Sequence, residues 1–415
     1  MKTVAIIGTL DTKGEEFAFL RDRVAEHGLQ PLVIDVGVLG EPRFRPDVSH
    51  DRVAELAGTS IADLRSSNDR GQALTAMATG AAMLTRELHE SGRLDAMIGM
   101  GGSGNASVAA AAMQALPTGV PKLLVTTVAS GDTRAYVGTT DVTLMPSVVD
   151  IAGLNRFSIR ILSNAAAAIS GMAAQEPPKS PEGTRPLVAA TMFGVTTPSV
   201  TAARQRLEEL GYEVLVFHAT GTGGRAMEAL ARDGYVTGVL DITTTELADE
   251  LVGGVFGAGP DRLEAAGIIG LPQVVSLGAL DMVNFGPMDT VPAKFRGRKL
   301  YVHNPTITLM RTTPEENAQL GEQIARKLNA ARGPLAVFVP RRGVSAIDVE
   351  GGAFFDPAAD AALFGALKRL LRPDIRLIEM DTDINDPSFA RAMADTFNDL
   401  YRRWEASRSA NEATE

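Results

Sequence analysis

The chain has 415 residues, of which 45% are hydrophobic and 5% aromatic, and its formal net charge is −10. This length exceeds what one hydrophobic core usually supports and predicts two domains, while the acidic balance, with no basic patch along the chain to offset it, argues against a nucleic-acid partner. The absence of cysteine excludes disulfides, a thiol nucleophile and a cysteine-ligated metal.

The first half of the chain alternates between short apolar runs and helical patterns. The apolar runs are typical of buried parallel strands, and the stretches between them predict helices. We expect strands at 4–7, 31–35, 94–100 and 122–128, and helices at 15–27, 71–91 and 103–116. This alternation predicts a doubly wound α/β sheet.

No segment of the sequence predicts a membrane span. The opening apolar run is too short for a signal-peptide core before Asp11 and Lys13. The most apolar later stretch, 159–174, is interrupted by Arg160 and Asn164, so it lacks the roughly 20 apolar residues that a span needs. We therefore expect a cytoplasmic protein with no membrane partner.

A proline-rich stretch at 175–186 predicts the boundary between the domains. Its prolines and its lack of apolar periodicity exclude a helix or a central strand. We therefore expect an N-terminal domain at 1–176, a linker at 177–186, a C-terminal domain at 187–406 and a flexible tail at 407–415.

The same alternation restarts after the linker. We expect strands at 187–192, 212–217, 236–241, 273–277, 299–302, 335–339 and 375–380, and helices at 200–210, 225–233, 314–331, 357–371 and 387–404. Both halves are thus predicted to be Rossmann-like α/β domains with mainly parallel, doubly wound sheets. A faint similarity between 4–9 and 188–193 is compatible with duplication, although any two doubly wound domains share such turns.

The turn after the first predicted strand has the composition of an anion-binding loop. A helix that begins there presents free N–H groups and the positive end of its dipole to a phosphate. The candidate ligands are Gly8, Thr9, Asp11, Thr12 and Lys13. The spacing differs from that of a P-loop, so a βα turn that only caps a helix is the alternative interpretation.

The turn after the third predicted strand indicates an anion-binding loop more specifically than the turn after the first strand does. Its residues are Gly101, Gly102, Ser103, Gly104 and Asn105. Small residues let a ligand approach the main chain, and the serine and asparagine add hydrogen bonds. The turn also approximates a dinucleotide fingerprint, but Ser107 occupies its third glycine position and the turn does not follow the first strand.

Two more strand ends complete the expected nucleotide site. Asp35 ends the second strand, where an acidic side chain can accept the hydroxyls of a ribose, with a structural cap as the alternative. The segment that ends the fourth strand adds Thr127, Ser130 and Asp132. Because parallel strand ends lie at one sheet edge, these loops can converge on one crevice.

Metal binding is expected only through a nucleotide. The five histidines have no i, i+4 pairing, so no dedicated metal site is predicted. A Mg²⁺ ion carried by phosphates could have its waters held by Asp11 or Asp132.

A second candidate site is expected in the C-terminal domain. His218 follows a predicted strand, Arg341 follows another, and Glu350 lies in a nearby glycine-containing turn. These types could perform acid–base chemistry on a small anionic substrate held by the arginine. A hydrogen-bonded structural histidine is the alternative interpretation of His218.

Four segments, 8–15, 129–133, 147–155 and 217–221, together resemble the Tm-one-like ATP-binding domain family, which is related to the N-terminal inhibitory domain of the tomato mosaic virus resistance protein. The resemblance runs from residue 1 to about 401. It implies two Rossmann-like subdomains, ATP with Mg²⁺ bound mainly by the first, and a homodimer, but no reaction. Asn105 stands where the family often has a glycine.

The sequence therefore predicts a cytoplasmic, two-domain ATP-binding protein with a second possible small-anion or catalytic site. An ATP-dependent or hydrolytic enzyme acting on a small carboxylic acid is the alternative. An NAD-dependent oxidoreductase is a weaker one, because the dinucleotide fingerprint is incomplete.

Overall fold

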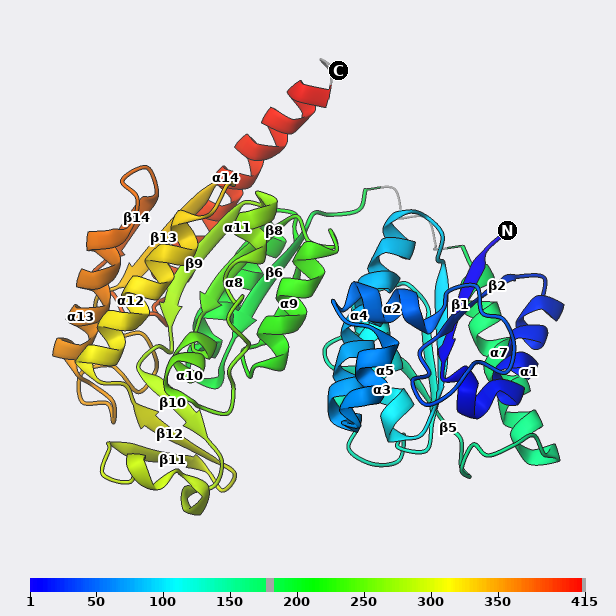
Figure 1. Cartoon of the computed structure of the whole chain (residues 1–415). Helices are drawn as coiled ribbons and strands as arrows, with labels where there is room; N and C mark the ends of the chain where they lie inside the picture. The colour runs from blue at the N-terminus through cyan, green and yellow to red at the C-terminus, as the bar shows by residue number, and fades with distance from the viewer. Residues whose placement is uncertain (177–182, 413–415) are drawn as a thin grey trace. The chain divides into compact units, whose positions relative to one another are not determined.

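The structure is a computed structural model that describes residues 1–176 and 183–412, with side chains described as far as residue 409. It divides into two compact units, Met1–Ser180 and Pro181–Glu415, which we call the N-terminal and C-terminal domains (Figure 1). The expected linker, 177–186, spans this division, and its residues 177–182 lie outside the described residues.

The N-terminal domain contains a parallel five-stranded sheet of order β2-β1-β3-β4-β5. The strands are β1 (Thr3–Gly8), β2 (Gln30–Asp35), β3 (Ala96–Gly101), β4 (Lys122–Thr126) and β5 (Thr143–Pro146). The sequence predicts the first four and misses β5. That strand is short, ends in proline and has no fully buried residue, so it lacks the apolar run that marks the others.

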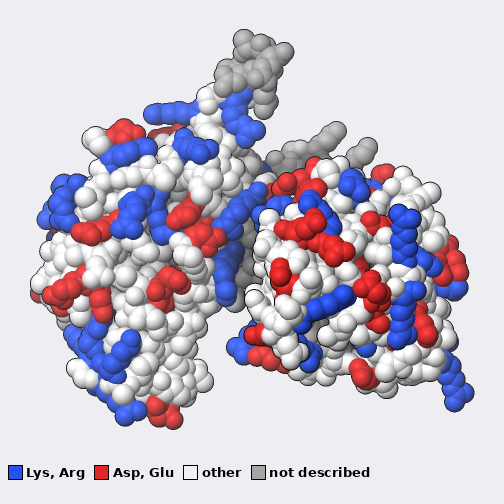
Figure 2. All heavy atoms as spheres, in the orientation of Figure 1, with Lys and Arg blue, Asp and Glu red and all other residues white. Residues whose placement is uncertain are grey.

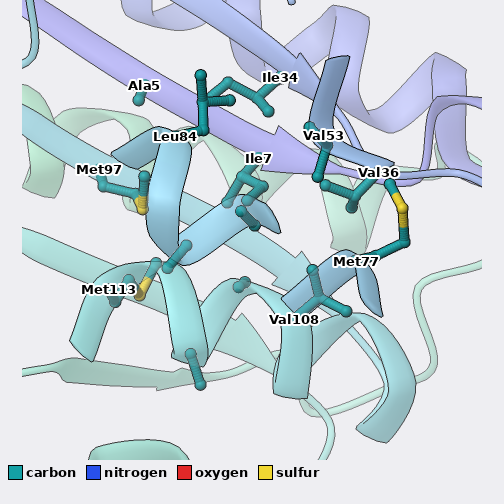
Figure 3. Packing of buried hydrophobic residues seen from close by; sticks show 14 of the residues in the cluster. Ala5, Ile7, Ile34, Val36, Val53, Met77, Leu84, Met97, Val108 and Met113 are labelled. Carbon is teal, nitrogen blue, oxygen red and sulfur yellow. The ribbon is translucent and has the colours of Figure 1, made fainter. Parts of the chain in front are cut away.

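Helices cover both faces of this sheet and bury two separate apolar clusters. The helices are α1 (Leu10–Glu26), α2 (His50–Leu56), α3 (Ile61–Ser67), α4 (Arg70–Glu90), α5 (Ser103–Gln114), α6 (Arg134–Val137) and α7 (Arg156–Ala174). Helices α1 and α7 pack against Val4 and Ile6, whereas α2, α4 and α5 pack against Ala5 and Ile7 (Figure 3). Successive strand residues face opposite sides, and this confirms the doubly wound α/β fold.

Helix α7 is the apolar stretch that sequence analysis excluded as a membrane span. Among the described residues it is the one helix that is long and apolar enough to cross a membrane by length and composition alone. It begins with a capping box between Asn155 and Ser158 and buries Leu162, Ala166 and Ile169 in the core. A core helix of a globular domain passes the same length and composition test.

The C-terminal domain contains a parallel six-stranded sheet of order β14-β13-β9-β8-β6-β7. Its strands are β6 (Leu187–Met192), β7 (Glu213–His218), β8 (Gly238–Thr243), β9 (Gln273–Gly278), β13 (Leu335–Pro340) and β14 (Arg376–Met380). A separate antiparallel sheet holds β10 (Met282–Phe285), β11 (Leu300–Asn304) and β12 (Ile307–Arg311). The strand expected at 299–302 therefore belongs to this small sheet.

The helices of the C-terminal domain are α8 (Thr197–Glu209), α9 (Thr222–Arg232), α10 (Glu246–Val252), α11 (Ala265–Ile269), α12 (Pro314–Asn329), α13 (Pro357–Leu370) and α14 (Pro387–Glu412). Proline occupies the first turn of α8, α12 and α13, where its missing N–H costs no hydrogen bond. Helix α14 continues through residues 407–412 of the expected tail, and 413–415 lie outside the described residues.

The two parallel sheets share one strand order, because β2-β1-β3-β4-β5 corresponds to β7-β6-β8-β9-β13. In each domain the chain adds the second strand on one side of the first strand and the third strand on the other side. The strand order therefore reverses between β1 and β3 in the N-terminal domain and between β6 and β8 in the C-terminal domain. At each of these positions, the loops after the two adjacent strands leave toward opposite faces of the sheet. Ligand crevices of open α/β sheets form at such switch points. The topology thus marks one position in each domain at which to look for a site.

Candidate functional site

A cavity of about 710 Å³ lies at the β1/β3 switch point of the N-terminal domain. Its lining comes from the turn after β1, the loop after β2, the α3–α4 junction with the first turns of α4, the first turns of α5, and Asp150 after β5. All of these segments belong to the N-terminal domain. The volume is within the range of small-molecule and cofactor sites.

The glycine-rich turn forms one wall of this cavity through Gly102, Ser103, Gly104 and Asn105. Gly101 precedes it with φ +154°, and a Cβ there would lie 2.8 Å from that of Asn105. Gly102 is the N-cap of α5 and no side chain caps this helix end. The first N–H groups of α5 are therefore available to a ligand.

Asn105 is the most buried residue of that wall, at 8% exposure. Its Nδ2 donates to the carbonyl of Met100, whereas its Oδ1 is buried without a hydrogen-bond partner. An amide that faces a cavity and has an unpaired oxygen is common where a ligand completes the site.

The turn after β1 contributes Thr9, Asp11, Thr12 and Lys13 to the lining. Helix α1 has Thr9 as its N-cap and is kinked at Lys13, which has φ −126° and ψ 30°. The Thr12 hydroxyl donates to Thr9 Oγ1 at 2.9 Å. The Lys13 ammonium donates to the carbonyl of Ile151, so this cation already has a partner within the protein.

Asp11 ties this turn to the loop after β2. Its Oδ2 accepts from the N–H groups of Leu39 at 2.9 Å and Gly40 at 3.0 Å. Its Oδ1 is buried without a hydrogen-bond partner.

Gly8 and Asp35 lie outside the cavity lining, so the structure does not bring them together with the other expected ligand residues. A Cβ on Gly8 would lie 1.7 Å from the ring of Phe17, so this glycine serves close packing of α1. Asp35 is fully buried, and its Oδ1 accepts from the N–H groups of Leu10 at 3.0 Å and Gly37 at 2.9 Å. The carboxylate therefore serves as a helix cap, which is the alternative interpretation considered for this residue.

His50 of α2 is a further neighbour of that buried carboxylate. Its Nδ1 lies 3.0 Å from Asp35 Oδ2. Burial raises the pKa of Asp35, while the two backbone N–H groups and the imidazole oppose that rise. The histidine comes from a helix that sequence analysis did not predict, so this pairing could not be foreseen.

Thr127, Ser130 and Asp132 also lie outside the cavity lining, contrary to expectation. All three are exposed, and the Arg134 guanidinium donates to Asp132 at 2.9 Å and lowers the pKa of that carboxyl to about 2. The physical reason is topological. Strand β4 lies outside the switch point, so its loop ends beside the glycine turn and not in the cavity.

The junction between α3 and α4 supplies cavity residues that sequence analysis missed. Leu64, Arg65, Asn68, Asp69 and Arg70 line the cavity here. Asn68 ends α3 in the left-handed conformation at φ 49°, and Asp69 caps α4 by accepting from the N–H of Gln72 at 3.0 Å. This Asn-Asp pair signals a helix boundary, but nothing in the sequence places that boundary beside β1 and β3.

The cavity lining also includes apolar side chains. Val36, Met77 and Val108 belong both to the cavity lining and to the buried core between the sheet and α4 and α5. Figure 3 shows the Met77 side chain extending toward Val36. The cavity lining therefore combines polar donors with an apolar surface supported by the core.

The corresponding switch point of the C-terminal domain is filled by its own side chains. The Thr191 hydroxyl donates to Asp241 at 2.7 Å, and the hydroxyls of Thr196 and Thr243 are 2.8 Å apart. All four residues are buried. Polar groups that would face a ligand are paired with each other here.

The glycine-rich turn of this domain, 221–224, is occupied by Glu246. Its Oε1 accepts from the N–H groups of Gly221 at 2.7 Å and Gly224 at 3.0 Å. Its Oε2 accepts from Nε of the fully buried Arg262 at 2.7 Å, and Arg262 also pairs with Asp241. A carboxylate of the protein thus lies where an anion would bind.

His218, Arg341 and Glu350 do not form one acid–base site, which corrects the second expectation. His218 ends β7 at one sheet edge, and its ring stacks on Phe193 at 5.5 Å. Arg341 follows β13, with β9, β8 and β6 between. At ordinary strand spacing this separation is about 19 Å, and Glu350 lies on the β13 side, where its charge acts on Arg342.

A buried charged cluster in this domain escaped sequence analysis. Arg311 lies 3.0 Å from Asp348 and 2.8 Å from Asp360, and Ser345 donates to Asp281 at 2.8 Å. Burial raises the pKa of Asp348 and of Asp281. Across the described residues, no group of three or more histidine or acidic side chains is arranged to hold a metal.

Comparison with known proteins identifies the family of the chain. Residues 2–178 match the N-terminal domain, and residues 185–401 the C-terminal domain, of the uncharacterised protein family UPF0261. A UPF0261 protein of Clostridium tetani is 54% identical over 394 residues, covering 95% of this chain and 97% of that protein. One from Rhizobium meliloti is 50% identical over 402 residues, covering 96% and 99%.

The ToMV resistance protein Tm-1(GCR237) of Solanum lycopersicum is 42% identical over 424 residues, which cover 96% of this chain and 55% of the plant protein. A UDP-N-acetylglucosamine 2-epimerase from Neisseria meningitidis is 10% identical with a TM-score of 0.25, over 66% of this chain and 82% of that one. The tomato match confirms the resemblance found in the sequence. The chain belongs to the UPF0261 family, to which the matching region of the tomato resistance protein is related.

Proposed function

We propose that this protein binds ATP in the cavity of the N-terminal domain. The observation that carries the proposal is the position of the cavity at the β1/β3 switch point, beside an uncapped helix N-terminus. The free N–H groups and the dipole of α5 favour phosphate oxygens. The apolar wall of Val36, Met77 and Val108 suits a purine base.

Asp11 is the residue that fits a hydrated Mg²⁺ ion. Its buried Oδ1 has no hydrogen-bond partner, and it lies in the same turn as the hydroxyls of Thr9 and Thr12. Magnesium usually keeps several waters and is held by substrate phosphates plus one or two carboxylates. When bound, it would neutralise part of the phosphate charge.

The proposal includes a homodimer, as the resemblance implies, and a cytoplasmic location, as expected from the sequence composition. Exposed apolar residues gather at and before the start of α7, where Leu154, Phe157 and Ile159 are 38%, 42% and 39% exposed. Exposed apolar groups of this kind are typical of interfaces. Sedimentation equilibrium should give twice the 43.8 kDa mass of the chain.

The Gly102→Asp substitution tests the cavity as the ATP site. The nearest atom to a Cβ on Gly102 is 3.8 Å away, and Asp is a good N-cap, so the variant should fold and keep its stability. Its carboxylate would repel phosphate at the α5 terminus. Gly171→Asp is the matched control, since that exposed glycine of α7 has nothing within 4 Å of a Cβ.

Thermal unfolding should be recorded with and without ATP and Mg²⁺, and with NAD in parallel. We expect ATP to stabilise the native chain and the Gly171→Asp control by about 2.7 kcal/mol at a hundredfold excess over Kd. It should not stabilise Gly102→Asp. An undiminished shift in that variant removes the glycine turn from the site, and a larger shift with NAD favours the oxidoreductase alternative.

A further inference from the structure

We propose that Arg70 is the cation that binds the phosphates in the N-terminal cavity, and that it makes the site select phosphorylated nucleotides over nucleosides. This inference rests on the proposed function and names a specificity-determining residue within the same site. Arg70 is the first residue of α4 and lies in the cavity lining.

The Arg70 guanidinium lies against the glycine turn. A Cβ built on Gly104 would be 3.1 Å from Nη2 of Arg70, and the next nearest atoms belong to Leu74. Gly104 is in the first turn of α5, where the N–H groups have no cap. The planar group of donors in the guanidinium and the N–H groups of α5 therefore border one volume.

The other two cations of the lining are held by protein carbonyls. Arg65 donates to the carbonyls of Val38 at 2.6 Å and Gly40 at 2.9 Å, which fixes the loop after β2. The Lys13 ammonium donates to the carbonyl of Ile151. Both side chains therefore have structural partners that a phosphate would have to replace.

Arg70 has no such partner. Within the described part of the chain no hydrogen bond or ion pair involves its side chain, and the adjacent Asp69 is turned back to cap α4. The unpaired guanidinium is positively charged and lies beside the N-terminus of α5, which carries a partial positive charge, so the two repel each other. A bound anion removes that repulsion, which is the physical reason to assign the pair to a ligand.

Asn105 gives independent evidence that this corner of the cavity is built for a ligand. It is nine-tenths buried, lines the cavity and has an unpaired Oδ1. It belongs to the same first turn of α5 that Arg70 approaches. The buried amide oxygen requires a hydrogen-bond donor, such as a hydroxyl or amino group, and the unpaired arginine beside it requires an anion. A nucleotide supplies both kinds of group.

The experiment compares ATP, ADP, AMP and adenosine by titration calorimetry with Mg²⁺ present. Arg70→Ala should weaken ATP binding by about 10- to 100-fold, as expected for loss of hydrogen bonds to a charged group. It should leave adenosine binding unchanged. Arg70→Lys should restore part of the loss, because lysine returns the charge without the planar donor group.

Two controls separate a local effect from a general one. Arg86→Ala removes an exposed arginine from the same helix outside the cavity lining, and should change no affinity. Lys13→Ala should weaken ATP binding less than Arg70→Ala does. An equal loss for adenosine and ATP in Arg70→Ala, or no loss for either, overturns the proposal.

Inorganic tripolyphosphate distinguishes failure of this inference from failure of ATP binding. If the native chain binds tripolyphosphate but no adenine compound, and Arg70→Ala abolishes that binding, the assignment of Arg70 as the phosphate-binding cation stands while the proposed function fails. If the native chain binds ATP and Arg70→Ala binds it equally well, the proposed function stands and the inference fails. Native protein that binds neither probe overturns both.

Discussion

Asp249 of α10 illustrates how burial controls the protonation of single carboxyls in the C-terminal domain. It is 1% exposed, and its carboxylate accepts from the backbone N–H of Asn284 at 3.0 Å and from Nδ2 of the same residue at 2.6 Å. Burial raises the pKa of Asp249 to about 7, although these hydrogen bonds oppose the rise. The folded domain therefore holds a proton that an unfolded chain would lose near pH 4.

This shift predicts the pH dependence of stability. A carboxyl whose pKa is raised by folding stabilises the folded state fully at low pH, and that contribution is lost as the pH rises from about 4 toward 7. The loss is at most about 1.4 kcal/mol per pH unit for one proton. We expect the free energy of unfolding of the C-terminal domain to fall from pH 5 to pH 7, and Asp249→Asn to reduce that slope.

Urea unfolding followed by tryptophan fluorescence checks this prediction. Trp404 is the single tryptophan of the chain and lies on α14, so it reports on the C-terminal domain. The exposed Asp289→Asn is the control and should leave the slope unchanged. Asn284 has an unpaired Oδ1 that can turn to accept from the new amide, which favours folding of Asp249→Asn. An identical slope in both variants would contradict the assignment.

Single residues also mark the limit of sequence reasoning. Gly102, Ser103, Gly104 and Asn105 were identified because small residues after a strand favour ligand approach, and they do line the cavity. Asp35 fits its expected role equally well in sequence. Its carboxylate is used internally, because backbone donors of α1 and the loop after β2 reach it first. Local pattern does not distinguish a carboxylate that faces a ligand from one that caps a helix.

At the scale of elements, the buried strands could be predicted from the sequence, whereas the short helices between them could not. Strands β1 to β4 carry apolar runs, whereas α2 and α3 are short helices of seven residues each, with polar positions throughout. Of these two helices, α3 lines the cavity together with the start of α4, whereas α2 supplies His50 beside Asp35. Contacts between segments distant in sequence decide which turn becomes a site, so Arg70 was missing from the expected site.

The glycine turn at 221–224 binds the carboxylate of Glu246 as it would bind an anion, so substitution of Glu246 should destabilise the domain. Glu246→Ala would leave two backbone N–H groups and part of the buried Arg262 guanidinium without a partner. Removal of one partner from a buried ion pair costs about 3–5 kcal/mol. We expect a loss of that size in the C-terminal domain, measured by urea unfolding with Trp404 fluorescence.

Added formate should partly restore the stability of Glu246→Ala, since its carboxylate can occupy the vacated position. Glu246→Gln keeps an oxygen for the two N–H groups but not the charge, so its loss should be smaller. Equal stabilisation of the native chain and Glu246→Ala by formate would show a general salt effect and refute this interpretation.

At the scale of the whole molecule, the net charge affects how a ligand approaches the protein. Figure 2 shows acidic and basic side chains interspersed over the visible face. A net charge of −10 repels a polyanionic ligand at long range. Binding of a nucleotide must therefore depend on local donors inside a cavity, such as those of α5 and Arg70, and should be reduced only slightly by salt at physiological ionic strength.

The division into two units predicts where binding resides. All residues that line the cavity belong to the N-terminal domain, which has its own sheet and its own two apolar clusters. A fragment of residues 1–180 should therefore fold and bind ATP with the affinity of the full chain, and a fragment of residues 183–415 should bind none. Circular dichroism establishes folding, and calorimetry measures affinity. Arg70→Ala should weaken binding by the same factor in the fragment and in the full chain, because its effect is local. A folded N-terminal fragment with much weaker ATP binding would instead assign part of the site to the second domain.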